Sequence, residues 1–170
     1  MPEPINLAVL GSTGSIGCNT LEVVRELRHL HVHSLSGYRN VALLKQQASE
    51  FSPKIVCVAD EASGASFDAT NSSTDWRFGN HHLETLASDP EVDIVVASIV
   101  GQAGLNSTLA AAAAGKRIAL ANKESMVVAG SLLTQTARKT GRRSFPLTAS
   151  TTPSGRRHWQ ANATKSGGSF

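Results

Sequence analysis

Short apolar runs alternate with segments of helical periodicity along most of this chain, and this alternation limits the fold more than any other feature. The expected strands cover residues 5–11, 30–37, 54–60, 92–101 and 117–122. The expected helices cover residues 15–28, 40–51, 81–88, 103–116 and 124–141, with a weaker helix at 61–70 and a polar loop at 71–80. Strands that are near-continuous in Val, Ile, Leu and Ala are typical of sheets buried on both faces. The pattern predicts an α/β fold with a doubly wound parallel sheet.

The alternation stops near residue 142 and divides the chain into two parts. Residues 1–142 form the expected domain. Residues 143–170 are rich in Ser, Thr, Gly and Pro and have no apolar period, which predicts an irregular, disordered tail. The length of 170 residues and the hydrophobic share of 41% suit one globular domain with a substantial core.

Charge and targeting signals exclude several classes of function. The net charge of +3 is too small to indicate a nucleic-acid partner, and no apolar run is long enough to span a membrane. The N-terminus lacks a basic signal region, and the two cysteines lack disulfide or metal-ligand spacing. We therefore expect a cytoplasmic protein.

The stretch GSTGSIG joins the first expected strand to the first expected helix. Gly11 permits a tight turn, Gly14 lets a pyrophosphate approach the backbone, and Gly17 lets the helix lie close to the strand. Unpaired N–H groups at a helix start favour an anion, and Thr13 and Ser15 add hydroxyl donors. The spacing is GxxGxxG rather than GxGxxG, so a glycine-rich turn without a ligand is the alternative. The position between strand and helix favours a Rossmann-like dinucleotide site.

The second expected strand ends in SLSGYRN. An Asp or Glu near this point usually binds the ribose 2′-hydroxyl of NAD, and none is present here. Arg39 stands there instead, accompanied by Ser36, Tyr38 and Asn40. A cation beside the ribose suits a 2′-phosphate and predicts NADPH. The alternative is that Arg39 is only the first solvated residue of the next helix.

A second group of polar residues follows the strand at 117–122. It consists of Asn122, Lys123 and Glu124. Carboxyl ends of strands in an open α/β sheet face the ligand crevice, so this group is expected near the nicotinamide. Lys123 suits a carbonyl, hydroxyl or phosphate of the substrate, whereas Glu124 has the alternative role of complementing a helix dipole. Ser98, Gly101 and Gln102 end the preceding strand, where they line the cofactor channel or close a turn.

Three motifs occur together: VLGSTGSIG, FSPKIVCVADEAS and GKRIALANKESMVVAG. Their order and spacing resemble the N-terminal part of the 1-deoxy-D-xylulose 5-phosphate reductoisomerases, over about residues 5–142. The resemblance implies a homodimer that converts this sugar phosphate to 2-C-methyl-D-erythritol 4-phosphate, with NADPH and Mg²⁺ or Mn²⁺, in the non-mevalonate isoprenoid pathway. By motif, the resemblance implies that the cofactor is bound by Thr13, Gly14, Ser15, Ile16, Tyr38, Arg39, Asn40, Asn122 and Glu124. It implies that Lys123 binds the substrate.

The resemblance ends at about residue 142. The family continues there with a segment such as IIPVDSEHNAIWQ, whose Asp and Glu are metal ligands. No carboxylate follows Glu124 in this sequence, so those ligands are absent and no metal-binding or catalytic residue is assigned. A coding sequence for the family segment, read one base late, yields SFPLTASTTPSGR, which is the sequence from Ser144 to Arg156. The hypothesis is a truncated, frameshifted reductoisomerase.

Three functions follow from these patterns. The first is the NADPH-dependent reductoisomerase itself, and the second is an NADPH-binding fragment without turnover. The third is another oxidoreductase with a GxxGxxG turn, such as a semialdehyde dehydrogenase, which requires a nucleophilic cysteine. Cys18 lies in the first expected helix and Cys57 inside a strand, so neither is placed for that chemistry.

Overall fold

A computed structural model describes residues 4–64, 67, 72–120, 146–150 and 158–161 of the chain. The strands are β1 (Ile5–Leu10), β2 (Leu30–Gly37), β3 (Ile55–Val58), β4 (Asp75–Phe78), β5 (Ile94–Ala97), β6 (Arg117–Leu120), β7 (Pro146–Ser150) and β8 (His158–Ala161). The helices are α1 (Ser15–Glu26), α2 (Val41–Phe51), α3 (Glu61–Gly64), α4 (His82–Ser88) and α5 (Gly101–Ala113). No helix in these ranges is long and apolar enough to cross a membrane.

The described strands form one sheet, in the order β4-β3-β2-β1-β5-β6-β7-β8. Strands β1 to β6 are parallel, which confirms the predicted Rossmann-like doubly wound architecture. The chain builds outward from β1 to β4 and then returns, so that β5 pairs with the other side of β1. This reversal in strand order lies between β1 and β5, and open α/β sheets bind their ligands at the carboxyl ends of the strands at such a point.

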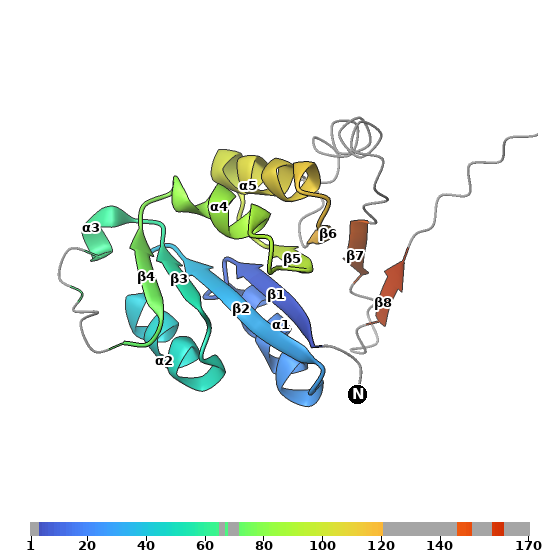
Figure 1. The fold of residues 1–170 in the computed structure, drawn as a ribbon, viewed down its shortest axis with the longest axis horizontal. Helices are drawn as coiled ribbons and strands as arrows, with labels where there is room; N and C mark the ends of the chain where they lie inside the picture. The colour runs from blue at the N-terminus through green and yellow to red at the C-terminus, as the bar shows by residue number, and fades with distance from the viewer. Residues whose placement is uncertain (1–3, 65–66, 68–71, 121–145, 151–157, 162–170) are drawn as a thin grey trace, which may run out of the picture.

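Helices cover both faces of the sheet (Figure 1). Leu7 and Val9 of β1 pack in the core with α1 and α2, and the alternating residues Ala8 and Leu10 pack in the core with α4 and α5. All four side chains are almost fully buried. Burial on both faces explains why these strands are apolar throughout, and it makes the central strands a rigid base for the turns at their carboxyl ends.

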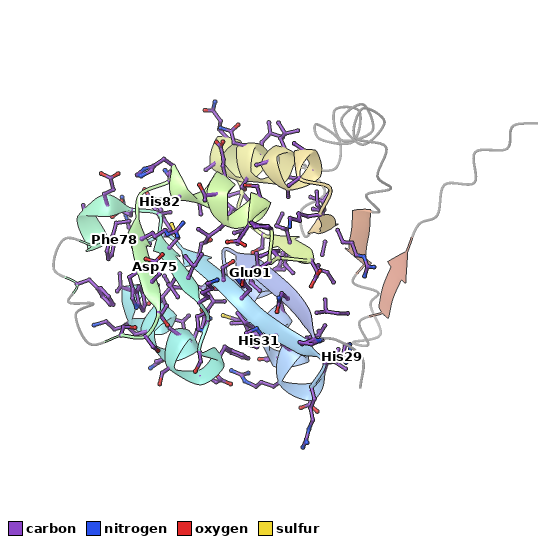
Figure 2. The ribbon with its side chains drawn as sticks, viewed as in Figure 1. His29, His31, Asp75, Phe78, His82 and Glu91 are labelled. Atoms are coloured by element: carbon purple, nitrogen blue, oxygen red, sulfur yellow. The ribbon has the colours of Figure 1, made fainter. Side chains whose placement is uncertain are left out.

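The prediction of a loop over residues 71–80 is wrong, because β4 lies within it and pairs in parallel with β3 at one edge of the sheet. Figure 2 labels Asp75 and Phe78 on this strand. The rings of Trp76 and Phe78 pack against Phe67, with centroid distances of 4.3 and 5.9 Å. Charged residues alternate with these aromatic residues, which suits a short edge strand. The alternation of charged and aromatic residues was the sequence signal for this strand, but the polar residues around it favoured the prediction of a loop.

The irregular tail expected from residue 143 differs from the structure at two short stretches. Strand β7 pairs in parallel with β6, and β8 pairs antiparallel with β7. An edge strand presents a row of unpaired backbone groups to which a further segment can pair, and β6 provides such an edge. The rest of residues 143–170 and the helix expected at 124–141 lie outside the described residues.

Candidate functional site

The turn between β1 and α1 is anchored to the end of the neighbouring strand β2. Gly11 adopts a φ of +86°, in the left-handed region that favours glycine. Its N–H donates to the carbonyl and hydroxyl oxygens of Ser36, at 3.0 and 3.1 Å. The Ser12 N–H donates to the same carbonyl at 2.7 Å. The backbone of the turn is therefore fixed by hydrogen bonds to β2.

A buried contact between Ser12 and Gln47 stabilises the turn. The Ser12 hydroxyl donates to Gln47 Oε1 at 2.7 Å, and Gln47 Nε2 donates to the Ser12 carbonyl at 2.9 Å. Ser12 is fully buried, and Gln47, on α2, is nearly so. A buried polar pair that satisfies itself in this way stabilises one geometry. Ser12 lies within the GSTGSIG motif, whereas no motif in the sequence included Gln47.

The glycines at positions 14 and 17 have different physical roles. A Cβ on Gly17 would lie 2.3 Å from the Gly11 carbonyl oxygen and 2.4 Å from Ser12 Cα, so close packing requires glycine there. A Cβ on Gly14 would contact only the Gly11 oxygen, at 3.4 Å. Gly14 is exposed and has a φ of −80°, a conformation open to any residue. The space beside Gly14 is therefore open to a ligand.

Helix α1 begins directly under this open space. Gly14 is its N-cap, and within the described residues no side chain forms a capping hydrogen bond there. The first N–H groups of a helix have no intrahelical partner, and the helix dipole places partial positive charge around them. No acidic residue lies in the first turn of α1. The geometry suits an anion such as a phosphate.

The loop after β2 supplies a cation at the same edge of the sheet. The Arg39 guanidinium lies 4.8 Å from the Tyr38 ring centroid, and its Nη2 donates to the Tyr38 hydroxyl at 3.3 Å. Arg39 Nε also lies 3.5 Å from Asp60 Oδ1, at the end of β3. Asn40 Oδ1 accepts a hydrogen bond from the Leu43 N–H at 3.1 Å and so caps α2. Arg39 is therefore the residue of this loop that presents a charge to solvent.

The end of β5 closes the other side of the turn. The Ser98 hydroxyl donates to the Leu10 carbonyl at 2.5 Å, which ties β5 to β1. Gly101 has a φ of +80°, and a Cβ there would contact nothing within 4 Å. Gln102 instead lines a surface hollow of about 480 Å³ between α4 and α5. Of the three residues expected at this strand end, only Ser98 directly follows β5, where it closes a turn; Gly101 and Gln102 begin α5, and both are exposed.

Neither cysteine is placed as a nucleophile. Cys57 is fully buried in β3, and burial raises the pKa of its thiol to about 12. A thiol that stays protonated and inaccessible is inert. Cys18 lies in α1, where its Sγ contacts the Ser12 carbonyl oxygen at 3.5 Å. This arrangement argues against covalent thiol catalysis of the semialdehyde dehydrogenase kind.

Residues 7–130 match the family model for 1-deoxy-D-xylulose 5-phosphate reductoisomerase. The chain belongs to this family. The reductoisomerase of Francisella tularensis subsp. novicida (strain U112) is 42% identical over 147 residues, which are 86% of this chain and 38% of the relative. The chain therefore spans well under half the length of the curated reductoisomerases that it matches.

Solved structures of reductoisomerases share the fold. A crystal structure in complex with NADPH, fosmidomycin and magnesium is 44% identical, with a TM-score of 0.75 over 84% of this chain and 36% of that one. The enzyme from Zymomonas mobilis in complex with NADPH is 37% identical, with a TM-score of 0.77 over 85% of this chain and 38% of that one. The described residues thus have the Rossmann-like fold of reductoisomerase NADPH-binding domains.

The structure places most of the residues expected from the reductoisomerase motifs on two adjacent turns. These are Thr13, Gly14, Ser15 and Ile16 after β1, and Tyr38, Arg39 and Asn40 after β2. Thr13 lies against the end of β2, because a Cβ on Gly37 would be 2.9 Å from the Thr13 methyl group. Residues Asn122, Lys123 and Glu124 lie outside the described residues.

The described part of the chain contains no group of three His, Cys, Asp or Glu side chains that could bind a metal ion. In the sequence, no carboxylate follows Glu124. Hard cations such as Mg²⁺ bind oxygen ligands, among which carboxylates are prominent.

Proposed function

We propose that this chain is the NADPH-binding part of a 1-deoxy-D-xylulose 5-phosphate reductoisomerase of the isoprenoid pathway. The observation that carries the proposal is the open helix N-terminus at Gly14 with the Arg39 cation on the adjacent strand end. A helix N-terminus suits the pyrophosphate of a dinucleotide, and an arginine suits its 2′-phosphate. The fold shared with reductoisomerases solved with NADPH supports the same assignment.

In this proposal each turn binds one part of the cofactor. The N–H groups that begin α1 and the hydroxyls of Thr13 and Ser15 bind the pyrophosphate, while Ile16 packs beside it. Arg39 binds the 2′-phosphate, and Asn122, Lys123 and Glu124 act near the nicotinamide and the substrate, as in the motif. The remaining residues of the second turn, Tyr38 and Asn40, flank the adenosine. NADPH would be the hydride donor of the family's reaction, and these residues would hold and orient it.

We further propose that this chain binds NADPH without catalysing the reaction. Rearrangement of an α-hydroxy ketone requires polarisation of adjacent oxygens, which is a task for a divalent metal. The sequence has no carboxylate after Glu124, as the frameshift hypothesis for the residues from Ser144 onward requires. Sequencing of the source DNA across that point, with mass spectrometry of the expressed chain, tests the origin of the tail.

The binding experiment is isothermal calorimetry of the purified chain with NADPH. We expect binding by the unmodified chain and at least tenfold weaker binding by Arg39→Ala, because a charge-assisted phosphate contact contributes about 1.5–3 kcal/mol. Arg28→Ala is the matched control, since Arg28 is exposed in the turn that follows the C-terminal end of α1. Equal affinity of the two variants, or no binding by the unmodified chain, would contradict the proposed site.

The turnover experiment follows NADPH absorbance in the presence of 1-deoxy-D-xylulose 5-phosphate and Mg²⁺. We expect that NADPH is oxidised no faster with the substrate than in a blank that lacks the substrate. A substrate-dependent rate would contradict the proposal that the chain is inactive and would leave the NADPH-binding assignment standing.

A further inference from the structure

Backbone hydrogen bonds extend the pairing of β2 and β3 past the ends of the strands. The Ala59 N–H donates to the Gly37 carbonyl at 2.8 Å, and the Asp60 N–H donates to the Tyr38 carbonyl at 3.3 Å. This pairing brings Asp60 beside the loop that carries Arg39, with Asp60 Oδ1 3.5 Å from Arg39 Nε. The sequence has no carboxylate directly at the end of β2, but the fold brings one there from the end of β3.

The Asp60 carboxylate is fixed independently of Arg39. Its Oδ2 accepts hydrogen bonds from the Ser63 N–H at 3.1 Å and from the Ser63 hydroxyl at 2.6 Å, as an N-cap residue does. These hydrogen bonds, with a smaller contribution from Arg39, hold the pKa of the carboxyl below its usual value. The Asp60 side chain is 17% exposed, whereas Arg39 is 67% exposed. A fixed anion therefore stands beside an exposed cation.

We propose that Asp60 is a specificity-determining residue that weakens binding of a 2′-phosphorylated adenosine relative to an unphosphorylated one. This inference rests on the proposed NADPH site. A 2′-phosphate that binds Arg39 must approach a fixed carboxylate of like charge, which opposes binding. Asp60 can instead accept a hydrogen bond from a 2′-hydroxyl, as the acidic residue at the ribose does in NAD-selective sites. Arg39 and Asp60 thus act in opposite directions, and their balance sets the selectivity.

The test compares adenosine 2′,5′-bisphosphate with adenosine 5′-monophosphate by calorimetry on the full chain. For Asp60→Asn we expect about a tenfold larger ratio of the two affinities, because one charge a few ångströms from the phosphate is removed. Asn is also a favoured N-cap, so the start of α3 is retained. The gain should shrink at high salt, as a charge effect does. An unchanged ratio, or weaker binding of the bisphosphate, would overturn the inference.

Two further variants serve as controls for folding and for the loss of an unrelated surface charge. Asp60→Ser also removes the charge and keeps an N-cap side chain, so it must change the ratio in the same direction if Asp60→Asn fails to fold. Asp75→Asn removes a carboxylate that pairs with Arg77 at 2.8 Å on β4, and it should leave the ratio unchanged. If the unmodified chain binds neither NADPH nor the bisphosphate, both the proposed function and this inference are wrong. If it binds both and Asp60 variants behave like the unmodified chain, only this inference fails.

Discussion

Replacement of Gly17 by alanine should destabilise the fold through a clash inside the turn. The added Cβ would lie 2.3 Å from the Gly11 carbonyl oxygen, 2.4 Å from Ser12 Cα and 2.7 Å from the Ser12 carbonyl carbon. Ordinary contacts of a Cβ begin at about 3.4 Å, so the overlap is about 1 Å. All three neighbours are backbone atoms, and the turn is held by hydrogen bonds to Ser36 and Gln47. No side-chain rotation relieves the clash.

The cost follows from overpacking, which typically destabilises by about 1–3 kcal/mol. The rigid backbone places Gly17→Ala at the upper end of that range, and the better helix propensity of alanine offsets up to about 1 kcal/mol. We expect a net loss of about 2 kcal/mol in the free energy of unfolding. For a chain of this size, that corresponds to a lower Tm by about 4–8 °C.

Urea unfolding followed by circular dichroism measures this loss, and Gly14→Ala is the matched control. At position 14 the Cβ has room, and the poorer N-cap is offset by the lower entropy of the unfolded chain, so stability should stay within about 0.5 kcal/mol. A Gly17→Ala protein as stable as the unmodified chain, or equal losses for the two variants, would refute the reasoning.

Three further expectations concern binding, reactivity and pH. Gly14→Ala should weaken NADPH binding about tenfold in calorimetry, because its Cβ occupies the approach of the pyrophosphate to the backbone. Iodoacetamide should modify Cys18 in the folded chain and Cys57 only after unfolding, as mass spectrometry can show, because burial raises the pKa of Cys57 to about 12. The hydrogen bond from Lys54 lowers the pKa of Glu91 below its usual value of 4.5 and raises that of Lys54. Glu91→Gln should therefore lower the urea midpoint at pH 7, and the difference from the unmodified chain should vanish as the pH falls well below 4.5; equal differences at both pH values would contradict it.

Most of the fold was predictable because burial on both faces leaves a strong local signal. The strand at Leu30–Gly37 and the helix at Val41–Phe51 agree with the expected ranges to within one residue. The strand at Asp75–Phe78 was missed because an edge strand keeps one side in water and so carries polar residues. The pairing of β7 and β8 with the sheet edge was missed for a related reason, since pairing to an edge depends on backbone groups rather than on an apolar pattern.

The candidate site was predictable only in part. Glycine spacing identified the turn, because tight turns and close approaches require glycine at definite positions. It did not separate Gly17, which the packing requires, from Gly14, which the packing leaves open. Asn40 was expected to bind the cofactor, and the structure shows its side chain capping α2. Both distinctions depend on neighbouring atoms that no local pattern identifies.

The amino-acid sequence by itself determined the parallel α/β sheet, the glycine-rich turn before its first helix and the positive charge of Arg39 near the second strand. These features depend on residues close together in the chain, so periodicity and motif spacing report them. Only the tertiary structure decided that Gln47 supports the turn from α2 and that Asp60 faces Arg39 from the end of β3. Such contacts arise when separate strands are placed side by side in the sheet, and hydrogen bonds between those strands, rather than spacing along the chain, determine which side chains meet.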